Sequence, residues 1–473
     1  MVFSRRYFLD PFGCAKNQVD AETLMARLNE AGWTGIDDPA GADLIIINSC
    51  GFIEAAKRES INAVLAWKKQ YPEKKILLAG CLAQRYQAEL EESLSEADGF
   101  LGCADLDRGP EKAEELFAGL QPNTARSEAV RHNAQPGCGP GLRPLLGFPG
   151  SAYVKISEGC NNRCSFCAIP LIRGPLECRS IPDIVEECTQ LLARGVKELC
   201  LIGQDIASYA PASGGISAGG ESALAALLGA IAQLPGDFWV RLLYLHPDHF
   251  SPDILRVVER DSRFLPYFDI PFQHASGRLL SLMGRNGDGP HCLRLLDTIR
   301  ARLPDAVIRS TFLVGFPGET EEDFAMLLDF QEQARFDWLG VFTWSREEGT
   351  PAYSMKGRVS KKVAAQRKAL VEERQIPITE ERMNRFVGRT MDVLVEEAFT
   401  ETPTAPPVRS ASASRDTPPA GLWLGRLFCQ APEVDGASVI RQAPQSGGTP
   451  PRPGSLIRGI VRARTGFDLE VEV

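Results

Sequence analysis

The stretch Glu158-Gly159-Cys160-Asn161-Asn162-Arg163-Cys164-Ser165-Phe166-Cys167 decides how the rest of the chain is interpreted. It comes directly after residues 152–157, an apolar run with the length and composition of a β-strand. The three cysteines are therefore predicted to lie in a loop at the carboxyl end of a strand. That is the edge at which barrels of alternating strands and helices carry their active sites. Three thiolates so close in sequence can bind one soft metal centre.

The number of cysteines in this loop favours an iron–sulfur cluster over zinc. A structural zinc site or an electron-transfer cluster usually has four protein ligands. Three cysteines on a 4Fe-4S cluster leave one iron free to bind the amino and carboxylate groups of S-adenosylmethionine. One electron would then cleave that cofactor and yield a 5′-deoxyadenosyl radical. The alternatives are three buried structural cysteines, or zinc with Cys178 as fourth ligand. Phe166 is a candidate cofactor contact.

The same loop begins a series of alternating strands and helices. Further candidate strands lie at residues 198–202, 239–245, 267–270, 308–314 and 340–344, with helical stretches such as 181–194 and 321–334 between them. Six strand–helix units predict an open (β/α)6 barrel, two units short of the usual eight. A charged helix predicted at 359–384 would pack across this barrel. The central domain is predicted to occupy residues 146–384.

Three further cysteines share one context near the start of the chain. Cys14, Cys50 and Cys81 each come just after a predicted strand, just before a predicted helix and next to a glycine. The apolar strand-length runs at 44–48 and 76–79 predict a parallel sheet with helices on both faces, which is a doubly wound α/β fold.

The carboxyl ends of parallel strands meet at one edge of a sheet, so Cys14, Cys50 and Cys81 are expected to converge. The adjacent glycines would let the backbone approach a bulky cluster. We predict a second 4Fe-4S site here, in an N-terminal domain that extends over residues 1–140. Small core thiols are the alternative. Cys103, which also follows a glycine, could contribute as well.

The C-terminal part of the chain has a different composition. Residues 386–473 contain no lysine, and nine Arg against ten Asp or Glu give a net charge of −1. Short β-type runs and two loops rich in Pro, Ser and Gly, at 402–420 and 442–454, predict a small all-β module. A surface that binds RNA would be expected to carry excess positive charge. We therefore predict no strong nucleic-acid binding.

The whole chain excludes several classes of protein. Its 473 residues carry 52 basic and 61 acidic side chains, a net charge of −9, and no apolar run reaches the ~18 residues of a membrane span. Thirteen cysteines spread through a long chain indicate reduced thiols in the cytoplasm. Ser4-Arg5-Arg6-Tyr7-Phe8-Leu9 is similar to a twin-arginine signal, but no apolar stretch follows it, so residues 5–10 are predicted to be the first strand.

These motifs together resemble the radical S-adenosylmethionine methylthiotransferases over nearly the whole chain. In that family an N-terminal methylthiotransferase domain precedes a radical barrel and a C-terminal TRAM-type β-barrel. The finer match is to the branch that modifies an aspartate of small-subunit ribosomal protein S-twelve. That match rests on Gly13-Cys14-Ala15-Lys16-Asn17, Cys50-Gly51-Phe52-Ile53-Glu54-Ala55-Ala56-Lys57, Gln273-His274, Glu347-Glu348-Gly349-Thr350-Pro351 and Ala431-Pro432-Glu433-Val434-Asp435-Gly436.

The resemblance implies two 4Fe-4S clusters, one held by Cys14, Cys50 and Cys81 and the other by Cys160, Cys164 and Cys167. It also implies two uses of S-adenosylmethionine. One transfers a methyl group to sulfur at the first cluster, and the other generates a radical at the second. The radical would take hydrogen from the β-carbon of the substrate aspartate, which then captures methylthio. The electron would come from a reductant such as flavodoxin or ferredoxin.

Other residues have two interpretations. Gln204 and Asp205 end a predicted strand and could bind the cofactor, or they could form a turn with a helix cap. A structural role is favoured for Gln273-His274, and Thr320 is predicted to cap a helix. Phe12 and Cys178 depart from the residue types expected in the family's motifs. The rival functions are a tRNA adenosine methylthiotransferase of the same family and a non-enzymatic iron–sulfur carrier.

Overall fold

The N-terminal strands form one parallel sheet in the order β2-β1-β3-β4-β5. A computed structural model describes residues 5–118, 143–211, 222–398, 421–442 and 450–473. The sheet consists of β1 Arg6–Pro11, β2 Thr34–Gly35, β3 Leu44–Ser49, β4 Lys75–Gly80 and β5 Gly99–Gly102, with helices α1 Ala15–Glu30, α2 Glu54–Gln70, α3 Cys81–Ser93 and α4 Gly109–Glu115. Every residue of β3 is buried, because helices cover both faces of the sheet.

The two faces of this sheet have separate cores. Side chains of α1 and α4 pack on one face around Leu24, Ile46 and Ala113. Side chains of α2 and α3 pack on the other face around Val64 and Leu90. This is the doubly wound α/β fold that the sequence predicts.

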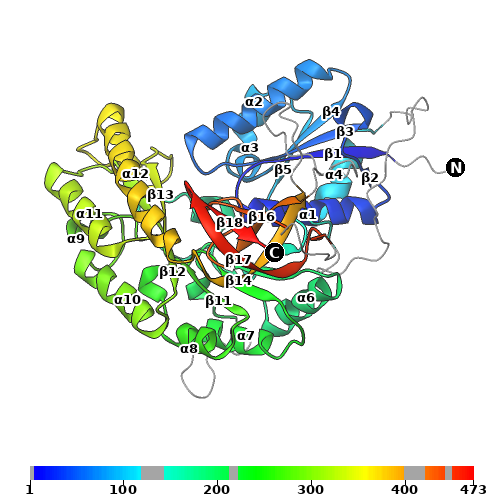
Figure 1. Ribbon diagram of the computed structural model, residues 1–473. Coiled ribbons are helices and arrows are strands. Elements are labelled where there is room, and N and C mark those ends of the chain that lie inside the picture. Colours follow the sequence, from blue (N-terminus) through cyan, green and yellow to red (C-terminus); the bar gives the residue numbers. More distant parts are fainter. Residues whose placement is uncertain (1–4, 119–142, 212–221, 399–420, 443–449) are drawn as a thin grey trace.

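A second parallel sheet forms the centre of the molecule, in the order β13-β12-β11-β10-β9-β6. Its strands are β6 Ser151–Lys155, β9 Glu198–Ile202, β10 Trp239–Leu242, β11 Phe264–Asp269, β12 Val307–Val314 and β13 Trp338–Thr343. The strands follow one another in chain order from one edge to the other. The predicted open (β/α)6 barrel is confirmed, and in Figure 1 it appears as a crescent.

Helices line the outside of this crescent. They are α6 Ile181–Ala193, α7 Ala223–Ile231, α8 Asp253–Arg260, α9 Gly277–Leu282, α10 Gly289–Arg302 and α11 Glu321–Ala334, followed by α12 Lys361–Asn384. The short helix α5 Ile169–Arg173 instead packs against α3 of the N-terminal domain. Short 3-10 turns complete the connections: η1 Pro39–Gly41, η2 Leu106–Arg108, η4 Ile206–Ser208, η5 Pro247–His249 and η6 Pro351–Ser354. Helix α12 packs against β13, as predicted for the charged helix. Thr320 caps α11 in a capping box with Asp323, also as predicted.

One strand boundary differs from its prediction for a clear reason. The apolar run 239–245 predicts a longer strand, but β10 ends at Leu242. Tyr244 has a φ of +67°, a left-handed conformation that a strand cannot continue through. The chain therefore leaves the sheet two residues after β10, at the edge where the functional groups gather.

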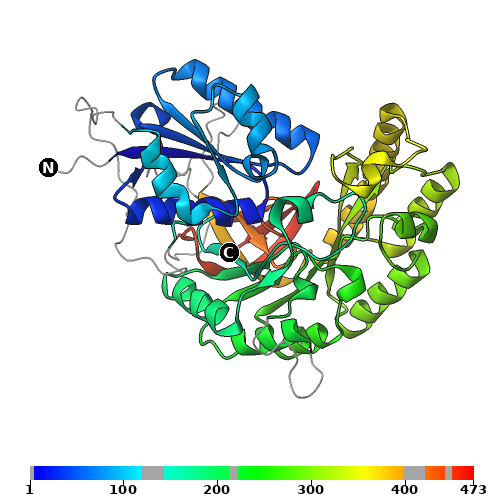
Figure 2. The same cartoon turned by 180° about the vertical axis from the view of Figure 1, so that it is seen from behind.

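The C-terminal strands close into a small barrel in the order β14-β15-β16-β18-β17. They are β14 Thr390–Ala398, β15 Leu422–Leu427, β16 Ser438–Arg441, β17 Leu456–Thr465 and β18 Asp468–Glu472. This barrel lies between the N-terminal domain and the hollow of the crescent (Figures 1 and 2). Loop 402–420 and most of loop 442–454 lie outside the described residues, as do Cys138 and the glycine-rich linker at 137–141.

The packing inside the crescent explains this position. Inward-facing aromatic residues of the central strands, among them Tyr153, Trp239 and Trp338, share one apolar cluster with Trp423 and Leu469 of the small barrel. In the part of the chain that the structure describes, no helix combines the length and the apolar character that crossing a membrane requires.

Candidate functional site

The first group of cysteines lies along the carboxyl edge of the N-terminal sheet. Cys14 comes between β1 and α1, Cys50 follows β3, and Cys81 is the first residue of α3 after β4. These three strands are neighbours in the sheet. Asn17 Oδ1 lies 3.5 Å from the Sγ atoms of both Cys14 and Cys81. We call Cys14, Cys50 and Cys81 the N-terminal thiol site.

Close backbone packing brings Cys50 to the same point. A Cβ atom on Gly51 would lie 2.6 Å from the carbonyl oxygen of Cys81, so only glycine fits between these loops. Burial, together with the charges of Cys14 and Cys81, raises the pKa of the Cys50 thiol to about 11. The convergence that the sequence predicts is therefore present in the structure.

A fourth thiol lies beside this site. Cys103 follows β5, the neighbour of β4, and packs with Cys81 against Ala168 and Ile172. A hydrogen bond from Cys103 lowers the pKa of Cys81 to about 7, although burial opposes this shift. A glycine next to the cysteine is the sequence signal that the four strand ends share.

The second group of cysteines lies in the loop at residues 158–167, which we call the cysteine loop. This loop follows the short strand β7 Ser157–Glu158, paired with β8 Glu177–Cys178, and precedes α5. Gly159 has a φ of +68°, and a Cβ atom there would lie 2.0 Å from the carbonyl oxygen of Pro175. Ser165 donates its N–H to the carbonyl of Met283 at 2.9 Å and accepts the N–H of Ala352 at 2.8 Å. These bonds fix the loop over the carboxyl ends of the barrel strands.

The three thiols of the cysteine loop affect one another. Burial raises the pKa of Cys160, and it raises the pKa of Cys167 to about 12. The charge of Cys164 adds to both shifts. Three thiolates confined in such a pocket repel one another unless a metal centre supplies positive charge. The donor set therefore fits an iron–sulfur cluster. Cys178 lies in the short strand β8, and its Sγ accepts the N–H of Ala210 at 3.3 Å.

Asp205 holds the cysteine loop through a hydrogen bond to Asn162. Its carboxylate accepts hydrogen bonds from Asn162 Nδ2 at 2.9 Å and from Ser208 Oγ at 2.6 Å, and it caps η4 through the N–H of Ala207. Burial raises its pKa, but hydrogen bonds from His249, Ser208 and Asn162 lower it to about 2. The cap interpretation is thus correct for Asp205, and the same side chain also holds the loop. The neighbouring Gln204 is half-buried.

Phe166 lies on the other side of the loop. Its half-buried ring packs against Leu279, Met283 and Phe316, and the guanidinium of Arg285 lies 6.0 Å from its centroid. This ring therefore anchors the loop on α9. His274 is fully buried and its Nδ1 accepts the N–H of Ser276, which agrees with the structural role favoured from the sequence.

The sequence did not point to two histidines near the loop. His246 immediately precedes η5 after β10 and His249 is the last residue of η5; the two rings are stacked with their centroids 5.0 Å apart. Ligand atoms of Asp205, His246 and His249 lie within 4.8 Å of one another. His249 Nδ1 lies 2.6 Å from the carboxylate of Asp205, whereas His246 Nε2 is buried and has no hydrogen-bond partner among the described residues. The string His246-Pro247-Asp248-His249 after a predicted strand is the signal that could have identified them.

Buried polar contacts join the N-terminal domain to the barrel. Lys16 Nζ lies 3.3 Å from the ring centroid of Tyr244, the residue with left-handed backbone. Lys155 Nζ lies 2.6 Å from Asp20. Arg143 contacts both Glu22 of α1 and Glu187 of α6. The two sets of cysteines are therefore held in a fixed relation to each other.

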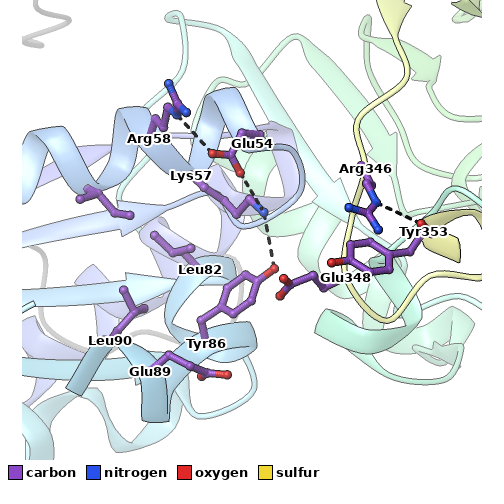
Figure 3. Close-up of a pocket in the computed structure, with 11 residues that line it drawn as sticks. Glu54, Lys57, Arg58, Leu82, Tyr86, Glu89, Leu90, Arg346, Glu348 and Tyr353 are labelled. Atoms are coloured by element: carbon purple, nitrogen blue, oxygen red, sulfur yellow. Dashed lines mark hydrogen bonds and ion pairs between the residues drawn. The ribbon is translucent and has the colours of Figure 1, made fainter. Parts of the chain in front are cut away.

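The acidic pair that follows β13 forms a further part of this junction. The buried carboxylate of Glu347 accepts Lys57 of α2 at 3.0 Å and Arg85 of α3 at 2.8 Å. Arg85 also donates to the carbonyl of Gly51 at 3.0 Å, beside Cys50. The neighbouring carboxylate of Glu348 is exposed and lines a pocket of about 400 Å³ between α2, α3 and η6. Figure 3 shows this pocket, with Tyr86 and Tyr353 on opposite sides.

Comparison with known proteins defines the class of enzyme. The model of the radical SAM superfamily matches residues 154–330, and that of the uncharacterized protein family UPF0004 matches residues 6–102. The fold is similar to that of the radical S-adenosylmethionine methyltransferase TsrM from Kitasatospora setae, solved with cobalamin and a [4Fe-4S] cluster bound. That structure has a TM-score of 0.52 and 17% identity, covering 74% of this chain and 77% of the other. The central barrel is thus a radical SAM domain.

Relatives named ribosomal protein uS12 methylthiotransferase RimO are similar over the full length. The protein from Treponema denticola is 45% identical over 98% of this chain and 99% of its own. The one from Desulfosudis oleivorans is 38% identical over 98% of this chain and 99% of its own. The chain belongs to this family of radical SAM methylthiotransferases. It is therefore an enzyme and not a non-enzymatic iron–sulfur carrier.

Proposed function

We propose that this chain adds a methylthio group to the β-carbon of an aspartate in ribosomal protein uS12, which is the small-subunit protein S-twelve named above. The observation that carries the proposal is the presence of two separate cysteine triads at strand-end edges that the domain junction holds together. The family's named members modify this protein.

The six cysteines would hold two 4Fe-4S clusters, one at the N-terminal thiol site and one at Cys160, Cys164 and Cys167. With S-adenosylmethionine bound, the second cluster supplies one-electron chemistry, which an unactivated carbon–hydrogen bond requires because it has no acidic proton. Phe166, Gln204 and Asp205 are the proposed contacts of that cofactor. Asp205 and Asn162 fix the loop geometry, and the buried ion pair of Arg173 with Asp20 joins the two sites.

Charge supports a protein substrate over an RNA. Arg426 of the C-terminal barrel is buried in an ion pair with Glu198 of β9 at 2.5 Å, so its positive charge is not available to phosphates. With a net charge of −1 over residues 386–473, no strong nucleic-acid binding is expected. We place the enzyme in the cytoplasm, where uS12 and a reductant such as flavodoxin or ferredoxin would be its partners.

The test compares two substrates for one enzyme preparation. The full chain is reconstituted anaerobically with iron and sulfide and is then given S-adenosylmethionine, dithionite and either uS12 or tRNA. Mass spectrometry is expected to find a methylthio group on one aspartate of uS12 and none on tRNA. Methylthiolation of a tRNA adenosine with unmodified uS12 would show the tRNA enzyme instead.

A further inference from the structure

One buried cation connects the two cysteine sites. Arg173 is the last residue of α5, the helix that begins two residues after Cys167. Its side chain is 1% exposed and enters the N-terminal domain. Nη2 lies 3.1 Å from Cys81 Sγ and 2.8 Å from Asp20 Oδ2, while Nη1 lies 2.8 Å from Glu158 Oε1 at the start of the cysteine loop.

The charges around Arg173 are nearly balanced before the thiols are counted. Asp20 and Glu158 each contact both Arg173 and Lys155, so two carboxylates face two cations. Asn17 Oδ1 adds a neutral acceptor 3.2 Å from Nη2. Within this group, the described contacts place the guanidinium of Arg173 directly against a thiol.

A cation hydrogen-bonded to a cysteine ligand changes the properties of an iron–sulfur cluster. Hydrogen bonds to the sulfurs and nearby positive charge favour the reduced, more negative form and so raise the reduction potential. The effect is large where water is excluded, because the local dielectric constant is low. Arg173 satisfies both conditions.

We propose that Arg173 is a positioning residue that sets the reduction potential of the cluster at the N-terminal thiol site and fixes that site against the cysteine loop. The inference rests on the proposed function, because it requires a cluster on Cys14, Cys50 and Cys81. The same side chain binds Glu158, two residues before Cys160, so a change at Arg173 reaches both sites.

The experiment isolates the N-terminal cluster in the full chain. A parent variant carries Cys160→Ala, Cys164→Ala and Cys167→Ala, so that one cluster remains. Anaerobic titration with dithionite, followed by electron paramagnetic resonance, measures the midpoint potential as the cluster takes up one electron. Arg173→Gln and Arg173→Lys are compared in this background. Arg179→Gln is the matched control, since it removes a partly buried cation that contacts Asp183 and Glu187 and no thiol.

Arg173→Gln is expected to shift the reduced-to-oxidised ratio at a fixed potential at least tenfold toward the oxidised form. A tenfold change corresponds to about 59 mV for one electron. Arg173→Lys retains the charge and should shift the ratio less, and Arg179→Gln should leave it unchanged. An Arg173→Gln potential equal to that of the parent, or a higher one, would overturn the proposal.

A second variant decides the matter if Arg173→Gln cannot hold the cluster. Asp20→Asn removes a negative charge beside Arg173 and keeps the cation. The midpoint potential should therefore rise, and the reduced-to-oxidised ratio at a fixed potential should shift at least tenfold toward the reduced form. An unchanged or lower potential would contradict the electrostatic account. A parent variant that binds no iron would instead refute the proposed function, so the two failures are distinguishable.

Discussion

The two cysteine triads reach similar arrangements by different routes. The cysteine loop places its three thiols within one short segment, and backbone hydrogen bonds to Met283 and Ala352, from two other parts of the same domain, hold it. The N-terminal thiol site collects its thiols from three separate strand ends. A site built within one loop depends on that loop, whereas a site built across a sheet depends on everything that keeps the sheet edge in register. The two sites should therefore respond differently to the same kind of damage.

The largest effect is expected from removing one ligand of each triad. Cys160→Ala should abolish release of 5′-deoxyadenosine, and Cys14→Ala should retain it, while both lower methylthio transfer by more than about a hundredfold. Each variant should lose about half of the bound iron, because the other cluster does not share its ligands. Iron analysis and chromatography of the cleaved cofactor check this. Loss of all iron in both variants would show that the two sites are not independent.

Breaking the junction should affect the N-terminal site first. Glu347→Gln leaves the cations of Lys57 and Arg85 without their buried carboxylate, which costs about 3–5 kcal/mol for comparable buried pairs. The unfolding free energy of the first transition in urea should fall by that amount, and the iron content of the N-terminal site should fall with it. The exposed Glu348 provides the control, and Glu348→Gln should leave both measurements unchanged. Equal losses in the two variants would mean that the junction does not depend on Glu347.

The contact between the strand-end loops offers a sharper probe. Gly51→Ala introduces a Cβ atom 2.6 Å from the carbonyl of Cys81 and should weaken iron binding at the N-terminal site by about ten- to a hundredfold. Release of 5′-deoxyadenosine should continue, since the cysteine loop is untouched. Gly229→Ala in α7 is the control, because no atom lies within 4 Å of the added carbon. Normal iron content in Gly51→Ala would contradict this close contact.

The smallest expected effect is a pH dependence of the unfolding free energy, caused by His274 in the central barrel. Burial lowers the pKa of His274 to about 4, and this residue precedes α9, on which the cysteine loop rests. Its pKa is depressed on folding, so its contribution to stability is present above about pH 6.5 and is lost as the pH falls toward 4. Between about pH 7 and pH 5.5, unfolding free energy should fall by about 1 kcal/mol. Urea unfolding at both pH values measures this. In His274→Gln this fall in unfolding free energy should be absent. If the fall persists in that variant, titration of other groups causes it.

Much of the architecture could be predicted because it depends on local signals. Continuous apolar runs identified the buried parallel strands, and helical spacing identified α6 and α11 to within one residue. The convergence of the first three cysteines followed from the geometry of parallel strands alone. The limits proposed for the three domains, at 1–140, 146–384 and 386–473, stay a prediction, as do the roles of the individual site residues.

The parts that escaped prediction depend on contacts between distant segments. Arg173 and Cys81 are brought together only when two domains pack, and nothing near either residue in the sequence indicates this. Glu347 was noted as part of a motif, but its two cationic partners lie on helices of another domain. Tyr244, which leaves the strand with a left-handed backbone, likewise contacts Lys16 of another domain.

The C-terminal barrel packs on the inward-facing side chains of the crescent, which makes it an internal part of the enzyme rather than an appendage. A truncated chain without it would expose Tyr153, Trp239 and Trp338 and would leave the fully buried Glu198 without Arg426, so we expect such a truncation to aggregate. Exchanging this module between related enzymes to transplant substrate preference would therefore require transplanting its crescent-facing side chains as a matched set.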